Sequence, residues 1–512
     1  MTLADRFEAE FIPLADLVGD QARAAPQVAV VDGDRKVSYR DLDAVMDRVA
    51  AALLARGVGP RDTVAICAAT SVEYVAVFLG ALRVGVAVAP LMPSATPESL
   101  AAMAADCGAK ILFLDATTRA SLAGIAIPRV ALDDQPGDPP FGAWLAPEDA
   151  KPSPVHVGPD FVFNVIYSSG TTGTPKGIEQ PHLMRWLHLK RLGPDAYGPD
   201  SRTLVSTPLY SNTTLVCLFP ALATGGTVIL MRRFDARGFL VLAEQHRATH
   251  AMLVPAQYSR IMAVEDFDAF DLSSFVLKLC TSAPFAAALK RDVLARWPGG
   301  LLEYYGMTEG GPTAILYAHR FPDKLHTVGQ PAPGSDIRLI DEHGREVTTP
   351  GEAGEIVGHS DAAMRGYRNQ PEKTREALWF DADGRRYVRT GDIGRFDADG
   401  FLILLDRRKD MIISGGFNVY PSDLEAILAQ HEAIAEAAVV GAPSRTWGET
   451  PAAFVVVRNG APSAEALREW ANARLGRTQR LAAVFVVDAL PRSAIGKVLK
   501  RELRAGLEAG FP

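Results

Sequence analysis

The chain has 512 residues, of which 48% are hydrophobic and 22% are charged, and its formal net charge is -7. The length indicates more than one folded unit, and the 44 glycines and 35 prolines indicate a globular protein with many turns. The negative charge and the lack of a basic block argue against nucleic acid as an electrostatic partner.

Cysteine usage and hydropathy indicate a cytoplasmic protein. The four cysteines, Cys67, Cys107, Cys217 and Cys280, are far apart in apolar runs and lack the spacing of metal ligands, which predicts buried, reduced thiols. The N-terminal segment MTLADRFEAEF is acidic and has no apolar core of the kind found in secretion signals. The longest apolar run, residues 215–231, is marginal in length for a membrane span and contains two adjacent glycines and a proline, so we expect a buried strand–turn–strand there.

Strand-like runs alternate with helical patterns over much of the chain. DTVAICAA (62–69), AKILFLDA (109–116) and FVFNVIY (161–167) are strand-like, and the last has the near-continuous apolar character of a strand buried on both faces. Between the first two, SVEYVAVFLGALRVG (71–85) has apolar residues at helical spacing after Ser71, a candidate N-cap. HAMLVPAQYSRIM and FVLKLCTSAP continue the alternation, and the proline-rich stretch 136–154 is expected to cross the surface. This rhythm predicts a layered α/β fold.

The pattern changes after Pro331. DIRLIDEHG, GEIVG and FLILLD indicate short strands separated by turns. From about Lys409, helix-like YPSDLEAILAQ and SAEALREWANARLG alternate with strand-like EAAVVGAP and PAAFVVVRNG. The charged run DRRKD (406–410) between these parts suits an exposed hinge. We therefore expect a large N-terminal domain, residues 1–408, and a small α+β domain, residues 409–512.

The stretch YSSGTTGTPKG (167–177) combines three glycines with five Ser/Thr hydroxyls. It follows the strand-like run 161–167 and is therefore expected at the carboxyl end of a strand, where open α/β sheets bind ligands. Its backbone N–H groups and hydroxyls can donate to an anion, and Lys176 adds a positive charge. The alternative is a flexible linker, since the stretch lacks the Gly-Lys-Ser/Thr ending of a P-loop.

Three further stretches carry groups that suit a nucleotide, although each such residue alone is more often solvated. In LEYYGMTEGG (302–311), Glu309 could hold a magnesium ion that bridges phosphates, and the preceding tyrosine rings could flank a purine or an acyl group. In YVRTGDIGRFDADGFLILLDRRKD (387–410), Asp392 in a Thr-Gly-Asp turn suits ribose hydroxyls, and Arg407 suits phosphate or ribose. In LPRSAIGKVLKREL (490–503), Lys497 follows Gly496 and could be delivered on a mobile loop.

In their order and spacing, these stretches resemble the adenylate-forming (AMP-binding) superfamily, in the branch of acyl- and aryl-CoA synthetases that includes fatty-acid, 4-coumarate and benzoate CoA ligases. The likeness covers nearly the whole chain, from KVSYRDLDAVMDRVAAALLARGVGPRDTVAI through YSSGTTGTPKG, YGMTEGG, GEAGEIVG and YVRTGDIG to DRRKDMIISGGFNVYPSDLE and PRSAIGK. In such enzymes a carboxylate attacks the α-phosphate of ATP to give an acyl-adenylate and pyrophosphate, and a thiol, commonly that of coenzyme A, then displaces AMP. The resemblance implies ATP, Mg²⁺ and coenzyme A, layered α/β subdomains with a β-barrel-like subdomain, and a mobile C-terminal domain.

The resemblance also implies roles for residues at matching positions. Lys497, Thr308 and Glu309 would be catalytic, and Thr172 with Glu309 would hold the metal. ATP and AMP would be bound by Ser168, Ser169, Gly170, Thr171, Thr172, Lys176, Ser282, Ala283, Pro284, Tyr305, Gly306, Met307, Asp392 and Arg407. Lys409 would be the hinge, and coenzyme A would contact Gly415, Gly416, Arg83 and Arg480. The acid would contact Tyr210, Ser211, Asn212, Gln257 and Gly311.

Departures from the family pattern leave the substrate open. Ser211 stands where many acyl- and aryl-CoA ligases have histidine, no aspartate suits an amino-acid substrate, and GRTQRLA (476–482) replaces a Tyr/Phe-Lys-x-Pro element. The segments TPLYSNTTLVC, LVPAQYS and GMTEGGPT contain no basic anchor and one acid, Glu309, which favours an acid with an uncharged tail. A medium-chain fatty acid and a substituted aromatic acid such as a benzoate or cinnamate both fit this expectation.

Three functions agree with these residues. The first is an AMP-forming CoA ligase whose partners are a carboxylic acid and coenzyme A, with a homodimer left open. The second is a stand-alone adenylating enzyme that loads a carrier protein, and the third is a luciferase-type oxygenase or a silent homologue. No carrier domain is fused, which favours coenzyme A, and the presence of Lys497 and Glu309 disfavours the silent case.

Overall fold

The computed structural model describes residues 3–24, 27–133, 135–168, 176–407, 410–414, 417–444, 447–458, 460–476, 479–492 and 498–508. The chain forms two compact units. Unit 1 contains Met1–Leu325, Pro331–Asp336 and Gly358–Val388, and unit 2 contains His326–Gln330, Ile337–Val357 and Arg389–Pro512. The predicted boundary between residues 408 and 409 lies outside the described residues, so that division of the domains stays a prediction.

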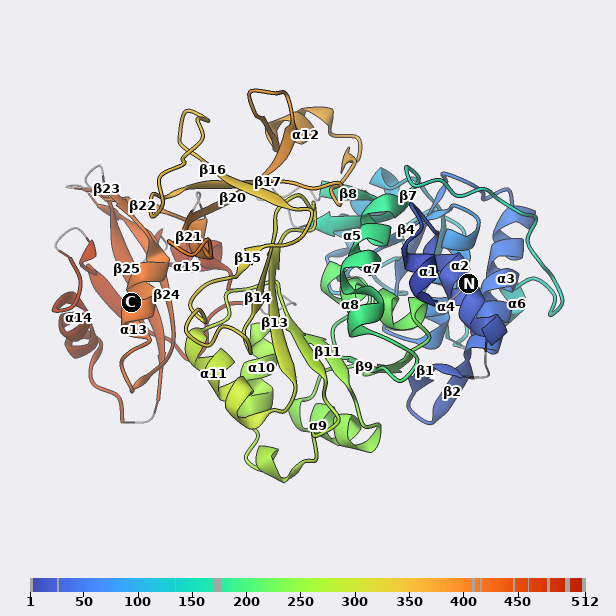
Figure 1. Ribbon diagram of the computed structural model, residues 1–512, viewed down its shortest axis with the longest axis horizontal. Coiled ribbons are helices and arrows are strands. Elements are labelled where there is room, and N and C mark those ends of the chain that lie inside the picture. Colours follow the sequence, from blue (N-terminus) through green and yellow to red (C-terminus); the bar gives the residue numbers. More distant parts are fainter. Residues whose placement is uncertain are drawn as a thin grey trace. The chain divides into compact units, whose positions relative to one another are not determined.

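The largest sheet of unit 1 has the strand order β15-β14-β13-β12-β11-β9-β10-β1-β2 among the described residues (Figure 1). The strands are β15 (Gln330–Pro331), β14 (Thr313–Tyr317), β13 (Gly300–Gly306), β12 (Leu277–Cys280), β11 (His250–Leu253), β9 (Arg202–Val205), β10 (Thr227–Leu230), β1 (Val28–Asp32) and β2 (Arg35–Ser38). The six strands from β13 to β1 in this order pair in parallel, whereas β14 and β2 pair antiparallel with their neighbours β13 and β1. The carboxyl ends of the parallel strands therefore share one edge of the sheet.

The second sheet of unit 1 has the order β18-β8-β7-β4-β3-β5-β6. Its strands are β18 (Gly366–Tyr367), β8 (Lys176–Pro181), β7 (Val162–Ser168), β4 (Ala87–Pro90), β3 (Thr63–Cys67), β5 (Ala109–Leu114) and β6 (Arg129–Ala131). Strands β7, β4, β3, β5 and β6 are parallel, and β8 returns antiparallel beside β7.

Helices of unit 1 follow most of these strands. They are α1 (Leu3–Phe7), α2 (Leu14–Ala24), α3 (Tyr39–Ala55), α4 (Val72–Arg83), α5 (Pro97–Asp106), α6 (Phe141–Trp144), α7 (His182–Ala196), α8 (Asn212–Ala223), α9 (Ala236–Gln245), α10 (Pro255–Met262), the 3₁₀ helix η1 (Phe267–Ala269), α11 (Ala287–Arg296) and α12 (Pro371–Glu376). The largest hydrophobic cluster joins α2, α3, α4 and α8 with strands of both sheets. This core fixes the two sheets and the helices between them in one unit.

Most expected elements of unit 1 are confirmed. The strand-like runs before and after α4 form β3 and β5, and the run 161–167 forms β7. Ser71 caps α4, because its side chain accepts a hydrogen bond of 3.1 Å from the backbone N–H of Tyr74. The proline-rich stretch 136–154 was expected at the surface, but it contains α6, whose Phe141 and Trp144 are buried.

The prediction for residues 215–231 is wrong. This run is the greater part of α8 followed by a turn and β10, not a strand–turn–strand. Nearly every residue of α8 is buried, so the helix lacks the polar face that would reveal a helical period. The turn depends on Gly225, whose φ of +87° lies in the left-handed region that favours glycine.

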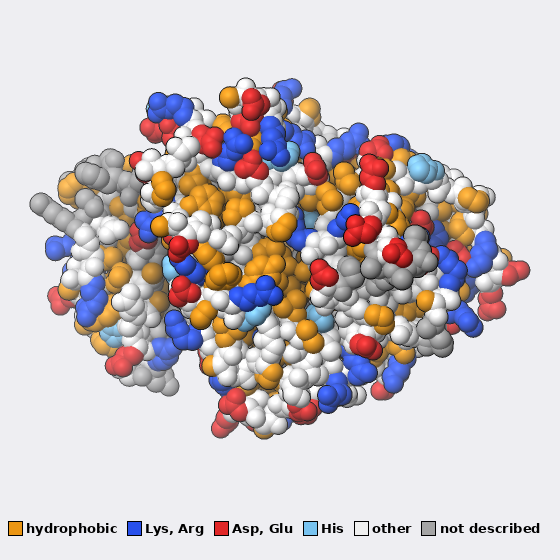
Figure 2. Space-filling view, viewed as in Figure 1, with side chains coloured by type: hydrophobic (Ala, Val, Ile, Leu, Met, Phe, Trp, Pro, Cys, Tyr) orange, Lys and Arg blue, Asp and Glu red, His pale blue; other side chains and the backbone are white. Residues whose placement is uncertain are grey.

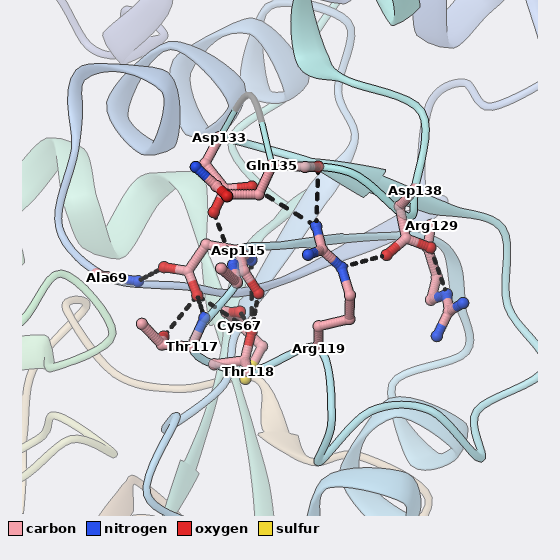
Figure 3. Close-up of polar contacts among 11 residues, drawn as sticks. Cys67, Ala69, Asp115, Thr117, Thr118, Arg119, Arg129, Asp133, Gln135 and Asp138 are labelled. Carbon is pink, nitrogen blue, oxygen red and sulfur yellow. Dashed lines mark hydrogen bonds and ion pairs between the residues drawn. The ribbon is translucent and has the colours of Figure 1, made fainter.

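The carboxyl ends of β3, β5 and β6 are joined by a polar cluster, which we call the Asp115 cluster and which contains Asp115, Thr117, Thr118, Arg119, Arg129, Asp133 and Asp138 (Figure 3). Asp115 follows β5 and accepts hydrogen bonds from the backbone N–H of Ala69 (2.7 Å) and from the backbone N–H of Thr117 (3.0 Å). Asp138 forms ion pairs with Arg119 (3.0 Å) and Arg129 (2.9 Å). Each buried charge in the Asp115 cluster is therefore matched by donors or by an opposite charge.

Unit 2 contains a C-terminal α+β part, as the sequence predicts. Its sheet has the order β23-β22-β25-β24, with β26 on β25, and is formed by β23 (Phe417–Val419), β22 (Ile412–Ser414), β25 (Gly448–Val457), β24 (Ile434–Ser444) and β26 (Ala483–Val486). Its helices are α13 (Pro421–Leu428), α14 (Ala464–Asn472) and α15 (Lys500–Glu508). A further sheet takes β19 from unit 1 and its other strands chiefly from unit 2. It has the order β16-β17-β20-β19, with β21 on β20, and is formed by β16 (Asp336–Ile340), β17 (Gly354–His359), β20 (Arg386–Phe396), β19 (Leu378–Phe380) and β21 (Leu402–Arg407). The mixed α/β fold with a large N-terminal and a small C-terminal part is thus confirmed.

Surface and core chemistry agree with the composition. Lys and Arg side chains are mixed with Asp and Glu over the visible face, without a large field of one sign (Figure 2). All four cysteines are free and buried, as predicted, and burial raises the pKa of Cys67 to about 12 and that of Cys107 to about 11. Within the described part of the chain, no helix combines the length and hydropathy needed to cross a membrane. The cytoplasmic location and the homodimer stay predictions.

Candidate functional site

One edge of the largest sheet collects the segments that the sequence assigns to the acid and the nucleotide. The loop after β9 leads through residues 206–211 into α8, and the residues after β11 begin α10. The loop after β12 holds residues 281–284, and the loop after β13 holds residues 307–312. Because β9, β11, β12 and β13 are parallel, all four segments leave the same edge of the sheet.

Hydrogen bonds connect the first three of these segments, together with α8, to one another and to β13. Gln257 Nε2 donates to the carbonyl of Ser206 (3.3 Å), which joins the ends of β11 and β9. The hydroxyls of Thr213 and Ser282 are 2.6 Å apart, which joins α8 to the loop after β12. Thr281 Oγ1 donates to the carbonyl of Tyr304 (2.8 Å), which joins that loop to β13. The segments therefore form one continuous polar edge.

Ser282 has a strained backbone at this edge. Its φ of +82° lies in the left-handed region, which a residue with a Cβ rarely adopts. The hydrogen bond to Thr213 and the bond between Thr281 and β13 hold the loop in this conformation. Strain of this kind is concentrated at ligand sites. It agrees with the predicted contact of Ser282, Ala283 and Pro284 with the nucleotide.

The predicted phosphate loop connects β7 to β8. Its two ends are directly paired, since Ser168 at the end of β7 faces Lys176 at the start of β8. Ser169, Gly170, Thr171 and Thr172 lie outside the described residues, and of Ser168 the structure describes the backbone only. The pairing places the start and the end of the loop side by side at the carboxyl end of β7, as the sequence predicts.

A tyrosine that the sequence does not reveal connects Lys176 to Glu309. Tyr367 on β18 donates a hydrogen bond of 2.8 Å to Glu309 Oε1, and its ring lies 5.0 Å from Lys176 Nζ. Burial, and then the nearby Glu309, raise the pKa of Tyr367, which keeps its hydroxyl a donor at neutral pH. Tyr367 is 58 residues from Glu309 in the sequence, in a turn-rich segment without a periodic signal. The pairing of β18 with β8 brings it to the site.

Two glycines set the position of Glu309 by close backbone contact. Gly310 has a φ of +71°, and a Cβ added there would lie 2.2 Å from the carbonyl oxygen of Ala362. Gly311 has a φ of +88°, and a Cβ added there would lie 2.7 Å from the carbonyl oxygen of Gly358. The backbone N–H of Met364 donates to the carbonyl of Glu309 (2.7 Å). Gly311 thus has a packing function, and its predicted contact with the acid stays a prediction.

A buried arginine, also missed in the sequence, joins the base of the phosphate loop to this edge. Arg185 on α7 donates to the side-chain oxygens of Asn164 (3.1 Å) and Asn212 (2.7 Å) and to that of Gln180. Gln180 Nε2 in turn donates to the carbonyl of Thr308 (2.6 Å). We call these four side chains the Arg185 network. It connects β7, β8, α7 and α8 with the residue next to Glu309.

Of the other residues predicted to contact the carboxylic acid, two have partners within the protein and two lie at the edge of the sheet. Asn212 belongs to the Arg185 network, and Gln257 bonds Ser206 and the backbone N–H of Val254. Tyr210 and Ser211 are partly exposed between β9 and α8, and burial raises the pKa of Tyr210. Their positions agree with a contact to the acid, which stays a prediction.

Unit 2 presents the predicted ribose residues on paired strands. Asp392 on β20 and Arg407 on β21 are directly opposite each other in the antiparallel pair, although only the backbone of Arg407 is described. The expected Thr-Gly-Asp turn is wrong, because residues 390–392 lie inside the long strand β20. Gly391 has a φ of +71°, and Thr390 Oγ1 accepts a hydrogen bond of 2.9 Å from the backbone N–H of Asp392. Turn-type residues thus form a local irregularity within the strand.

Comparisons with known proteins decide the family. The sequence model described as AMP-binding enzyme matches residues 19–368, and the one described as AMP-binding enzyme C-terminal domain matches residues 423–497. This chain belongs to the AMP-binding enzyme family. The resemblance inferred from the motifs is therefore confirmed.

Individual relatives match over nearly their whole length. A feruloyl-CoA synthase from Amycolatopsis sp is 36% identical over 495 residues, which cover 94% of this chain and 97% of that protein. A 4-coumarate–CoA ligase from Oryza sativa subsp. japonica is 32% identical over 526 residues, which cover 98% of this chain and 96% of that protein. The solved structure of an amide bond synthetase from Marinactinospora thermotolerans superposes with a TM-score of 0.87 at 29% identity, and covers 96% of this chain and 99% of that one.

In this AMP-binding enzyme, backbone pairing joins the residues that flank the segment of the predicted catalytic lysine. Arg492 and Val498 form an antiparallel bridge, and the backbone N–H of Leu499 donates to the carbonyl of Pro491 (2.8 Å). Lys497 itself lies outside the described residues, as do the hinge Lys409 and the glycines Gly415 and Gly416. Their roles stay predictions.

The two arginines expected to contact coenzyme A differ in their surroundings. Arg480 is exposed in unit 2, where a ligand could reach it. Arg83 on α4 forms ion pairs of 2.5 Å with Asp43 and Asp47, and 13% of its side chain is exposed. The geometry therefore gives Arg83 a role in packing α3 against α4, and its contact with coenzyme A stays a prediction that these ion pairs disfavour.

Proposed function

We propose that the chain is an ATP-dependent, AMP-forming ligase that joins an aromatic carboxylic acid to the thiol of coenzyme A. One observation carries this proposal: the predicted acid segments and nucleotide segments leave the same edge of one sheet and are hydrogen-bonded to one another. A carboxylate and an α-phosphate bound there would be held close together, which is the main requirement for their reaction. The relatives named feruloyl-CoA synthase and 4-coumarate–CoA ligase favour the aromatic acid over the medium-chain aliphatic one.

The first half-reaction joins two anions, so the enzyme must neutralise charge. The carboxylate of the acid attacks the α-phosphorus of ATP, an O–P bond forms, and pyrophosphate leaves with the electron pair of the broken bond. Lys176 and the loop before it are proposed to bind the departing phosphates, and Lys497 to neutralise the charge that develops between carboxylate and α-phosphate. Asp392 is proposed to accept hydrogen bonds from the ribose hydroxyls.

Glu309 fits the magnesium ion that the family implies. Its carboxylate is partly exposed, and Tyr367 uses one acceptor position of Oε1, whereas a carboxylate offers about four such positions. Tyr367 and the close packing of Gly310 fix the direction of this carboxylate. When bound, the metal would supply positive charge to the phosphate oxygens.

The second half-reaction transfers the acyl group to a thiol. The thiol sulfur attacks the acyl carbon of the adenylate, a C–S bond forms, and AMP leaves. Among the described residues of unit 2, Ile413 on β22 and Trp447 just before β25 are large apolar side chains that are 53% and 56% exposed, and these two strands pair at Ser414 and Gly448. We propose that this apolar surface, which lies close in sequence to the predicted glycines 415 and 416, meets the thiol-bearing arm.

The proposal is tested by pyrophosphate release and thioester formation, with and without coenzyme A, over a panel of aromatic and aliphatic acids. We expect pyrophosphate release with an aromatic acid and a free thioester only when coenzyme A is present. A product with a carrier protein or an amine, but none with coenzyme A, would contradict the acceptor. No pyrophosphate with any acid would contradict the activity itself.

Lys497→Ala separates the two half-reactions. We expect it to lower adenylate formation by roughly 100-fold or more, because one positioned charge is lost from the transition state, and to leave thioester formation from pre-made adenylate largely intact. Arg501→Ala, which removes an exposed cation of the same basic segment, is the control and should change neither half-reaction. Equal loss of both half-reactions would show that Lys497 does not act in adenylation alone.

A further inference from the structure

Helix α15 begins three residues after Lys497 and packs against the sheet of the C-terminal part. Its Leu503 is 4% exposed and lies in a hydrophobic cluster with Val440 on β24 and Phe454 on β25. Lys500 is the first residue of this helix. The hydrophobic cluster therefore sets the position of Lys500 relative to the C-terminal sheet.

Lys500 forms ion pairs with two carboxylates that come from different elements of unit 2. Its Nζ lies 2.9 Å from Glu425 Oε1, on α13, and 3.8 Å from Asp406 Oδ2, on β21. The side chains of Lys500 and Asp406 are 16% and 7% exposed, so water and salt screen this pair only weakly. The predicted domain boundary lies between Asp406 and Glu425. The pair with Asp406 therefore joins the two predicted domains, whereas the pair with Glu425 lies within the C-terminal one.

Two further contacts hold the end of β21 against the C-terminal part. The backbone N–H of Ser422, in the first turn of α13, donates to Asp406 Oδ2 (3.2 Å). The hydroxyl of Ser422 donates to the carbonyl of Leu405. A carboxylate at the N-terminus of a helix accepts from backbone donors that otherwise have no partner, and the helix dipole favours it there. Asp406 thus contacts both α13 and α15.

These contacts connect the predicted ribose residues to the predicted catalytic segment. In the β20–β21 pair, Asp406 faces Ile393, one residue after Asp392. At the other end of the ion pair, Lys500 directly follows the backbone pairing that flanks the segment of Lys497. The ion pair of Asp406 with Lys500 therefore links the strands that carry the ribose residues to the segment that carries the catalytic lysine.

We propose that Lys500 and Asp406 are positioning residues for Lys497, and that their ion pair holds the lysine segment against β20 and β21 while the adenylate forms. This inference rests on the proposed function and extends it to two residues that act without touching the substrate. An ammonium neutralises the charge that develops between carboxylate and α-phosphate only when it is held close. A displacement of about 1 Å in a catalytic group can lower a rate about 100-fold.

A purely structural role of Lys500 would act through Glu425 instead. Their ion pair joins α15 to α13, and Glu425 Oε1 also accepts a hydrogen bond from the backbone N–H of Val439 on β24 (2.7 Å). Loss of that pair would loosen the C-terminal part as a whole and would affect both half-reactions. Loss of the pair with Asp406 should affect adenylate formation alone, because Lys497 is proposed to act there. The two carboxylates therefore separate the two roles.

The first test measures pyrophosphate release without coenzyme A, and thioester formation from pre-made adenylate, for Lys500→Met, Asp406→Asn and Glu425→Gln. We expect the first two to lower kcat for pyrophosphate release at least about tenfold, with KM for ATP and thioester formation within about twofold of wild type. Glu425→Gln is the matched control, because its amide oxygen still accepts from Val439, and both half-reactions should stay near wild type. If Glu425→Gln lost as much as Lys500→Met while Asp406→Asn kept the wild-type rate, the proposal would be overturned and Lys500 would have a structural role.

The second test asks whether the two residues act through one contact. The double variant Lys500→Met/Asp406→Asn should lose no more than either single variant, because the same ion pair is removed, and Lys500→Arg should restore most of the rate. Losses that multiply in the double variant, or an equal loss of both half-reactions, would overturn the proposal. Unchanged pyrophosphate release in Lys500→Met would overturn this inference alone. Absence of pyrophosphate release by the wild type with any acid would overturn the proposed function, and this inference with it.

Discussion

The carboxyl ends of two groups of parallel strands in unit 1 are occupied in different ways. At the ends of β3, β5 and β6, the Asp115 cluster pairs each carboxylate with backbone donors or with arginines (Figure 3). At the ends of β9, β11, β12 and β13, the polar groups include a strained Ser282 and, from the adjacent α7, a buried Arg185 without an anionic partner in the described chain. The same position in a sheet therefore holds a charge-compensated cluster in one case and the proposed ligand site in the other.

The difference lies in which charged groups lack an opposite charge, not in how many polar groups gather. Asp138 is as buried as a core residue, with a side chain 5% exposed, yet two arginines neutralise it. Arg185 is equally buried but meets neutral amides. Closed clusters stabilise a fold, because each buried charge is compensated, whereas open clusters cost stability and are retained where a ligand completes them.

Removing one carboxylate from each edge gives the largest expected contrast. Glu309→Gln should lower pyrophosphate release by roughly 100-fold, because the carboxylate proposed to hold the magnesium ion is lost. Asp115→Asn should leave kcat/KM within about twofold and lower the melting temperature instead, because an amide nitrogen then faces a backbone donor. Steady-state kinetics and thermal unfolding of both variants measure this. A comparable loss of activity in Asp115→Asn would remove the distinction between the two edges.

A change of backbone geometry beside Glu309 should come next in size. Gly310→Ala adds a Cβ that would lie 2.2 Å from the carbonyl of Ala362 at a positive φ, so the loop must move and Glu309 with it. We expect at least about a tenfold loss of kcat/KM, since small misplacement of a catalytic group is costly. Gly334→Ala is the control, because Gly334 also has a positive φ but no atom within 4 Å of the added Cβ. Equal kinetics of the two variants would argue that the close contact does not position Glu309.

The parts of the fold and site whose signal lies within one segment follow from the local sequence. The strands β3, β5 and β7 and the capped helix α4 follow from apolar runs and from Ser71. Asp392 and Arg407 were found in one stretch, and the structure pairs them across a hairpin. Helix α8 was missed because it is buried on nearly all sides, so its residues carry no polar period.

The parts that were missed depend on contacts between distant segments. Tyr367 reaches Glu309 only because β18 pairs with β8, and the sequence of neither strand indicates this pairing. Arg185 was unremarkable as one of several basic residues on α7, and its role emerges from Asn164 and Asn212, which lie on other elements. The polarity of a side chain is visible in a sequence, whereas its burial and its lack of a counter-charge are properties of the fold.

The contribution of the Asp115 cluster to stability can be tested separately. Asp138→Leu leaves Arg119 and Arg129 without their shared carboxylate, and we expect a loss of about 2 kcal/mol in the free energy of unfolding, with unchanged kcat/KM. Asp160→Asn is the control, because its ion pair with Arg61 is between side chains 68% and 54% exposed and should contribute nothing measurable. Denaturant unfolding of the two variants checks the difference. Equal stability of Asp138→Leu and wild type would show that the ion pairs of Asp138 do not stabilise the fold.

Helix α7 should also affect how the free energy of unfolding depends on pH, and this effect is the smallest of those predicted. His182, at the start of α7, is buried between the rings of Phe11 and Phe163, and burial lowers its pKa from 6.5 to about 3. Above pH 6.5 the imidazole is neutral in both states. As the pH falls from 6.5 towards 3, the unfolded chain takes up a proton that the folded chain does not, so the folded state loses stability.

At pH 5.5, one unit below the ordinary value, this effect amounts to about 1.4 kcal/mol. His182→Phe should therefore reduce the fall in the free energy of unfolding between pH 7 and pH 5.5, measured by denaturant unfolding at both values. His343→Phe, at an exposed loop position, should leave the wild-type slope unchanged. If the free energy of unfolding of His182→Phe fell as much as that of the wild type, His182 would not be the source of the effect. The imidazole would then have to bind its proton in the folded state, in surroundings more accessible to water than the structure indicates.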